Sequence, residues 1–144
     1  MIEAVRYIMS AQPIAVVGVS DKDFGGMIYR TLKNRDIKVY PVHPARSEFA
    51  EDKCFATLKD LPPDVKTAVV AVSPASALRV VDDAIAAGYT HLWFQQGAKF
   101  DDAEAKAKAA GIETVSGKCI LMYAGELEGV HKFHRFLAKL LGKY

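Results

Sequence analysis

The sequence predicts an α/β fold: a Rossmann-like, three-layer, doubly wound sheet of about five parallel strands, with an extra C-terminal helix. Short apolar runs rich in β-branched residues recur along the chain, and such runs are typical of strands buried on both faces of a parallel sheet. Segments with helical spacing separate them, and this alternation indicates βαβ units with right-handed crossovers. The predicted strands are Ile14–Val17, Ile37–Val42, Thr67–Val72, His91–Phe94 and, more weakly, Ile112–Val115.

The first predicted helix follows the first strand. That strand ends in Gly18-Val19-Ser20, and Met27, Ile28 and Leu32 then recur at helical spacing. Gly25-Gly26 lies at the start of this helix. Because glycine lacks a Cβ atom, the pair lets a ligand or a loop approach the helix closely.

Two further helices have clear start and stop signals. Ser73 is placed to cap the second helix, Pro74 suits its first turn, and Gly88 is the expected C-terminal glycine. The third helix is predicted over Asp101–Ala110, where two acids suit the positive helix N-terminus, and it stops at Gly111.

The connection from Val42 to Thr67 is long, and we interpret it as a loop with one short helical turn at Thr57–Leu61, before Pro62-Pro63. Numbering the predicted strands in chain order, we expect the order 3-2-1-4-5 across the sheet. This is the order of the dinucleotide-binding form of the fold.

The C-terminal segment, Gly125–Tyr144, has an amphipathic helical pattern. An apolar stripe along one side of a helix favours docking of that helix on its own chain. A homodimer contact and a membrane-surface helix are the alternatives. The apolar stripe consists of Leu127, Val130, Phe133, Leu137, Leu140 and Leu141.

A chain of 144 residues suits a single domain (1–144), with a core at about 12–123. The net charge of +2 and the lack of an arginine-rich stretch argue against nucleic acid as a partner. Cys54 and Cys119 have no metal-ligand spacing and are expected to be reduced thiols. The segment Met1–Gln12 lacks a signal-peptide layout, and no apolar run approaches the ~20 residues of a membrane span. We therefore expect a cytoplasmic protein without a membrane partner.

The first strand–helix turn is a candidate phosphate site. A strand that ends in glycine and opens toward a helix leaves backbone N–H groups for a pyrophosphate, and here these belong to Gly18, Val19 and Ser20, with Gly25 close behind. The spacing is not G-x-G-x-x-G, so structural glycines in a domain without a ligand are the alternative explanation.

The end of the second strand favours a phosphate over NAD. An NAD site places a carboxylate there for the ribose hydroxyls, whereas this chain has His43, Pro44 and Arg46 and no acid. Arg46 can form paired hydrogen bonds to a phosphate. The alternative is that Arg46 is an ordinary surface cation.

The third and fourth strand ends add polar or small residues to the same sheet edge. Val72-Ser73-Pro74 follows the third strand, where Val72 can flank an adenine ring. Gln95-Gln96-Gly97 ends the fourth strand. Carboxyl ends of parallel strands line ligand sites in open α/β sheets, so four such ends together favour a site.

With these residues in view, the sequence resembles the stand-alone CoA-binding domain proteins, which are similar to the nucleotide-binding domain of the succinyl-CoA synthetase α subunit. The resemblance spans about Gln12 to Tyr123. The segments that carry it are IAVVGVS (Ile14–Ser20), VYPVHPARSEF (Val39–Phe49), AVVAVSP (Ala68–Pro74), LWFQQGA (Leu92–Ala98) and KCILMY (Lys118–Tyr123).

The resemblance implies CoA or acyl-CoA bound across the carboxyl edge of the sheet. It implies the pyrophosphate at Gly18-Val19-Ser20, the 3′-phosphoadenosine near Pro44 and Arg46, and the adenine against Val72-Ser73-Pro74. It places Gln96-Gly97 toward the pantetheine. The chain departs from the family's Asn-Pro-Lys after the second strand, which reads His43-Pro44-Ala45-Arg46 here.

The sequence offers little support for catalysis. His131 and His134 share a helix face but have no third ligand at metal-binding spacing. His43 is a polar neighbour of the site rather than a general base, and Cys119 suits a small buried residue better than a reactive thiol. We expect no catalytic residue and no metal site, and a binding protein more than an enzyme.

Two enzyme hypotheses stay open beside a non-catalytic CoA-binding protein. An NAD(P)-dependent oxidoreductase would use the same fold, and its NADP form would also use Arg46. The second is a CoA-ligase component that needs a partner chain for phosphate transfer. The fold is compatible with all three and decides none of them.

Overall fold

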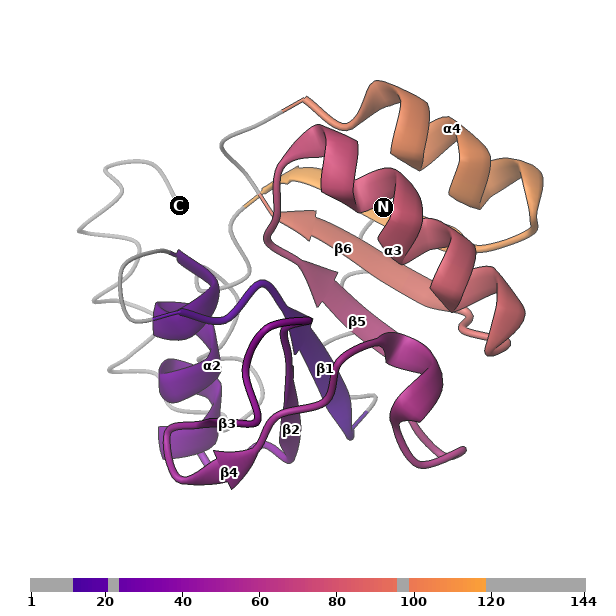
Figure 1. Ribbon diagram of the computed structural model, residues 1–144. Helices are drawn as coiled ribbons and strands as arrows, with labels where there is room; N and C mark the ends of the chain where they lie inside the picture. The colour runs from indigo at the N-terminus through magenta and orange to yellow at the C-terminus, as the bar shows by residue number, and fades with distance from the viewer. Residues whose placement is uncertain (1–11, 21–23, 96–98, 119–144) are drawn as a thin grey trace.

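A five-stranded parallel sheet lies between helices on both faces (Figure 1). This computed structural model describes residues 12–20, 24–95 and 99–118. The sheet order is β2-β1-β5-β6-β7. Its strands are β1 (Ile14–Val17), β2 (Val39–Val42), β5 (Thr67–Val70), β6 (His91–Gln95) and β7 (Glu113–Lys118), and the helices are α2 (Phe24–Asn34), α3 (Pro74–Ala86) and α4 (Asp101–Ala109).

The side chains of β1 show why both faces are covered. Ile14 and Val16 belong to the core cluster that contains the α2 residues Ile28 and Leu32. Ala15 and Val17 point to the opposite cluster, together with residues of α3 and α4. Because neighbouring side chains of a strand alternate between faces, an all-apolar strand requires a layer on each side. The three-layer, doubly wound Rossmann-like fold predicted from the sequence is therefore confirmed.

The predicted strand order, 3-2-1-4-5, is wrong. In the same numbering the observed order is 2-1-3-4-5, because β5 pairs with β1 rather than with β2. The connection from β2 to β5 explains the difference. Its apolar residues Leu58, Leu61 and Val65 pack on the α3 face, so the chain crosses to that face and returns beside β1. The direction of winding consequently reverses between β1 and β5, which is the topological switch point of the sheet.

The same connection contains a hairpin that the sequence analysis missed. The two-residue strands β3 (Glu48–Phe49) and β4 (Asp52–Lys53) are antiparallel, and Ala50 and Glu51 between them have positive φ angles of 50° and 71°. The expected short helical turn is confirmed as the 3-10 helix η1 (Leu58–Asp60).

The helix signals of the sequence are confirmed in α3 and α4. The Ser73 hydroxyl accepts a hydrogen bond from the Ser76 N–H (3.3 Å), and Pro74 lies in the first turn of α3. Gly88 and Gly111 follow the two helices with φ angles of 77° and 86°. The predicted C-terminal helix at 125–144 lies outside the described residues. Within the described part of the chain, no helix is long and apolar enough to span a membrane.

Candidate functional site

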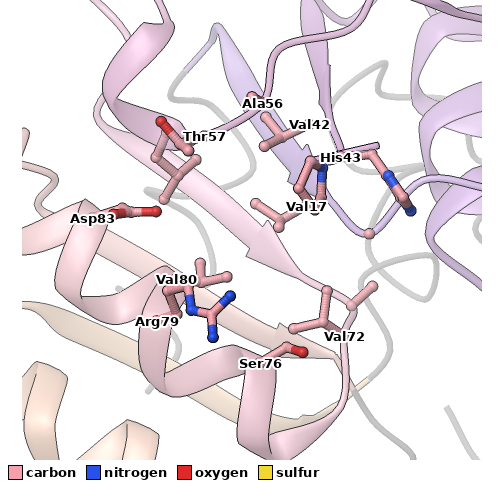
Figure 2. Close-up of a pocket in the computed structure, with 14 residues that line it drawn as sticks. Val17, Val42, His43, Ala56, Thr57, Val72, Ser76, Arg79, Val80 and Asp83 are labelled. Atoms are coloured by element: carbon pink, nitrogen blue, oxygen red, sulfur yellow. The ribbon is translucent and has the colours of Figure 1, made fainter. Parts of the chain in front are cut away.

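A pocket of about 280 Å³ opens at the carboxyl ends of β1, β2 and β5, where the winding of the sheet reverses (Figure 2). We call it the switch pocket. One wall is the face of α3, and the other comes from the residues that follow β2 and precede η1. Its lining residues are Val17, Gly18, Val42, His43, Pro44, Ala56, Thr57, Leu58, Ala71, Val72, Ser76, Arg79, Val80 and Asp83.

Gly18 forms the end of the pocket at the carboxyl edge of the sheet, and only glycine fits there. Its φ angle is 100°, and a Cβ atom would lie 2.3 Å from the Ala71 carbonyl oxygen and 2.8 Å from Val72 Cγ1. The Gly18 N–H donates to the Val42 carbonyl (2.9 Å). A Cβ on Gly25 would lie 2.2 Å from the Gly18 carbonyl oxygen, so the start of α2 packs directly on this turn. The two glycines hold the turn tight against both α2 and the end of β5.

The interior of the pocket is mainly apolar. Valines from β1, β2, the β5–α3 connection and α3 line it. Figure 2 shows the side chains of Val17, Val42, Val72 and Val80 around one space. Apolar walls with a few polar groups are typical of pockets that take a small organic ligand. This arrangement suits a flat ring with polar edges.

His43 follows β2 at the wall of the pocket. Its backbone N–H donates to the Phe55 carbonyl (2.9 Å), which fixes the residue at the pocket wall. The Ala45 N–H donates to His43 Nδ1 (3.0 Å). Because Nδ1 accepts this bond, the N–H of the ring is on Nε2.

Thr57 and Asp83 form the end of the pocket farthest along α3 from Ser76 (Figure 2). Thr57 is held by its capping box with Asp60, since its N–H and hydroxyl both donate to Asp60 Oδ2 at 3.1 and 3.0 Å. The Asp83 side chain is 19% exposed and has Lys59 Nζ at 3.6 Å. This end therefore offers a carboxylate and a hydroxyl as hydrogen-bond acceptors.

Arg79 lies between Ser76 and Asp83 on α3 and is exposed. It is the only Lys or Arg among the lining residues of this pocket that the structure describes. No hydrogen bond or ion pair joins it to another described residue. A guanidinium group is permanently charged and carries five N–H donors. The pocket thus contains an available cation.

The structure brings some of the predicted site residues together and separates others. Gly18, Pro44 and Val72 line the switch pocket, while Val19 is buried in the core cluster on the α2 face. Ser20 and Gly25 adjoin Gly18 without lining the pocket, and Ser73 and Pro74 begin α3 beside it. Pro74 lines a second hollow near Lys99 and the start of α4. Gln96 and Gly97 lie outside the described residues.

Arg46 does not line the switch pocket. Its Cζ atom lies 5.6 Å from the centre of the Phe49 ring, and Arg30 Cζ lies 4.7 Å from the same ring. Phe49 is buried in the core cluster of the α2 face. Arg46 is thus near the pocket in sequence but packs toward the hairpin, and its predicted contact with a phosphate stays a prediction.

Sequence reasoning missed the contribution of α3. Ser76, Arg79 and Asp83 are spaced by three and four residues, so they share one face of a helix. The sequence predicted α3, and because α3 starts directly after a strand end, its first turns were expected near the edge of the sheet. Without the strand order, the sequence did not indicate which helix lies at the switch point.

The thiol of Cys54 belongs to the core cluster of the α2 face. It is free and buried, and burial raises its pKa above the ordinary value, although the His43 N–H and Arg46 act in the opposite direction. A raised pKa disfavours the thiolate, the reactive form. Cys119 lies outside the described residues. Among those that are described, no three His, Cys, Asp or Glu side chains gather as a metal-ligand set.

Comparison with known proteins identifies the relatives of this chain. It is 28% identical over 80 residues to the acetate–CoA ligase (ADP-forming) of Methanocaldococcus jannaschii, covering 54% of this chain and 11% of that protein. A hypothetical protein from Pyrococcus horikoshii OT3 is similar in structure, with a TM-score of 0.79 and 29% identity, covering 88% of this chain and 90% of that one.

A larger enzyme contains a similar unit. The dinucleotide-forming acetyl-coenzyme A synthetase 1 of Ca. Korarchaeum cryptofilum matches with a TM-score of 0.67 and 27% identity, covering 76% of this chain and 27% of that one. This chain therefore corresponds to only a part of the matched ligases. A family model described as a CoA binding domain matches residues 12–125. The family resemblance seen in the sequence is confirmed: the chain belongs to the CoA binding domain family.

Proposed function

We propose that this protein binds CoA or an acyl-CoA in the switch pocket and holds it without itself catalysing a reaction. The observation that carries the proposal is the pocket at the reversal of the sheet, closed at one end by the Gly18 turn. Ligands of open α/β sheets bind at this position. The family membership supports a CoA-type ligand.

The parts of the pocket match the parts of the nucleotide. The tight glycine turn supports a pyrophosphate, because backbone N–H groups at a strand–helix turn favour an anion. The valine-lined interior supports the adenine ring, and Val72, which the sequence predicted beside the adenine, is assigned instead to the pyrophosphate end next to the Gly18 turn. Pro44 adds an apolar contact at the β2 end. In this assignment Gly18 bounds the pyrophosphate by its close backbone, since its own N–H is donated to the Val42 carbonyl, and the contacts predicted for Val19 and Ser20 stay predictions.

The ligand class is tested by thermal unfolding with CoA, acetyl-CoA, NAD, NADP and ATP. A ligand at about 100 times its dissociation constant adds about 2.7 kcal/mol of stability. The proposal expects stabilisation by CoA species and none by NAD or NADP. Stabilisation by NADP without an effect of CoA would support an oxidoreductase instead.

The location is tested by a pair of substitutions on α3. Ser76 lines the pocket and Ala86 does not, and both are exposed. Ser76→Phe places a ring over the pocket and is expected to weaken CoA binding at least tenfold in titration calorimetry. Ala86→Phe adds the same ring elsewhere on the helix, so its affinity should match the wild type. Equal affinities for all three proteins would place the ligand elsewhere.

A second candidate function is a CoA-ligase component that works with a partner chain. It is favoured by the observation that the matches to this chain cover only 11% and 27% of the length of the two enzymes. In that case CoA would still bind the isolated chain. Turnover of an acyl-CoA with a nucleoside diphosphate and phosphate would be seen only after the partner chain is added. CoA binding without any such partner-dependent turnover favours the binding protein.

A further inference from the structure

The cations near the switch pocket are engaged in different ways. Lys59 approaches Asp83 at 3.6 Å, and Arg46 lies over the Phe49 ring. Arg79 lines the pocket and makes no hydrogen bond or ion pair with any residue that the structure describes. Its donors are therefore available to a ligand, whereas Lys59 already has a carboxylate partner.

Polar groups follow a fixed order along α3. Ser76 comes first, near the Gly18 turn and Val72, then Arg79, then Asp83 at the Thr57 end (Figure 2). With a rise of 1.5 Å per residue, Arg79 lies about 4.5 Å along the helix axis from Ser76, and Asp83 lies about 6 Å farther. The pocket thus presents a glycine turn, a cation and a carboxylate in sequence.

The nucleotide half of CoA has a matching order: a pyrophosphate, a ribose with a 3′-phosphate, and adenine. This step rests on the proposed function. With the pyrophosphate at the Gly18 turn, the base extends toward Thr57 and Asp83, whose acceptors suit the exocyclic amino group of adenine. The reversed ligand would bring its pyrophosphate beside the Asp83 carboxylate, and like charges repel. The ribose then lies at the level of Arg79.

We propose that Arg79 determines specificity for the ribose phosphate, so that the pocket prefers CoA to 3′-dephospho-CoA. An arginine can form two parallel charge-assisted hydrogen bonds to a phosphate. The Asp83 carboxylate lies about 6 Å farther along α3, so it repels a phosphate at Arg79 less than it would repel a pyrophosphate placed directly beside it.

The test compares the affinities of CoA and 3′-dephospho-CoA for the wild type, Arg79→Gln and Arg46→Gln by titration calorimetry. We expect the wild type to bind CoA at least about tenfold more tightly, which corresponds to about 1.4 kcal/mol. Arg79→Gln should bring the ratio of the two affinities close to one, because CoA binding weakens while 3′-dephospho-CoA binding stays within about twofold. Arg46→Gln should keep the wild-type ratio. Arg79 is exposed, so an unchanged circular dichroism spectrum and unfolding temperature without ligand are expected.

The possible outcomes separate this proposal from the proposed function. A ratio that falls in Arg79→Gln and is retained in Arg46→Gln supports Arg79. A ratio that falls only in Arg46→Gln, or a wild type that binds both ligands equally, overturns the role of Arg79 and leaves CoA binding in place. A wild type that binds neither ligand overturns both.

Discussion

In the hairpin on the α2 face of the sheet, polar side chains bind one another, whereas at the switch pocket on the α3 face an arginine without such a partner faces a cavity. The Tyr29 hydroxyl donates to Asp52, and Lys33 bridges the hairpin through Asp52 (2.8 Å) and the Ala50 carbonyl (3.0 Å). In the switch pocket, Arg79 has no hydrogen-bond or ion-pair partner within the described part of the chain. Polar groups satisfied within the protein hold the fold, while groups facing a cavity are available for binding.

The two faces also differ in packing. Tyr29 and Phe49 are buried at 0% and 3% exposure and contact each other edge-to-face, with ring centres 5.7 Å apart. Burial and the hydrogen bond to Asp52 raise the pKa of Tyr29. The hairpin is thereby fixed to α2. On the other face, the small residues Ala77 and Ala84 bring α3 close to the sheet, but the pocket beside them is not filled by side chains.

The largest effect on stability is expected at Gly18, because this turn packs closely against both the start of α2 and the end of β5. Gly18→Ala should lower the free energy of unfolding by about 3 kcal/mol, through its positive φ angle and the overlap with the Ala71 carbonyl. Gly111→Ala is the matched control, since Gly111 also has a positive φ angle but no atom within 4 Å of the added Cβ. The control should lose only about 1 kcal/mol in urea unfolding. Equal losses would show that the close approach at Gly18 does not matter.

An intermediate effect is expected from a substitution on the α2 face. Tyr29→Phe keeps the buried ring and removes the hydroxyl that donates to Asp52, so the free energy of unfolding should fall by about 1–2 kcal/mol. CoA affinity should be unchanged, because this residue does not line the switch pocket. Arg79→Gln should show the reverse pattern. A loss of CoA affinity beyond twofold in Tyr29→Phe would remove the distinction between the two faces.

The smallest effect concerns the pH dependence of the hairpin. Hydrogen bonds from Lys33 and Tyr29 lower the pKa of Asp52 in the folded state. Its stabilising contribution is therefore complete above the unfolded pKa of about 4 and is lost as pH falls through the folded pKa. Because the side chain is 38% exposed, the contribution should stay below about 1 kcal/mol. Asp52→Asn should be less stable than the wild type at pH 7, and the gap should close below about pH 4. A gap independent of pH would contradict this.

Much of the fold follows from local patterns. Continuous apolar runs predicted the five strands, and Ser73, Gly88 and Gly111 predicted helix ends, because capping and positive φ angles depend on single residue types. The strand order did not follow, since it depends on which face Leu58 and its neighbours cover. The hairpin was missed because its turn uses Ala50 and Glu51 in a conformation that their residue types do not favour.

The sequence predicted those parts of the candidate site that depend on strand ends, and it did not predict the parts that depend on the strand order. The end of β1 and the end of β5 were correctly expected to share an edge, and Gly18, Pro44 and Val72 do line one pocket. Arg46 was chosen because it follows a strand end, but its side chain packs toward Phe49. Arg79 lines the pocket from a helix whose position depends on the whole topology, so the local sequence indicated that this helix starts at the sheet edge but not that it lies at the switch point.

The central claim is that CoA occupies the switch pocket on the α3 face. It is tested most directly by titrating the isotopically labelled full chain with CoA and following backbone amide shifts by NMR. We expect the largest changes at Gly18, Val72, Ser76 and Arg79, which line the pocket, and small changes in the β3–β4 hairpin and at Tyr29. Changes concentrated at Tyr29 and the hairpin, with the pocket unaffected, would contradict it.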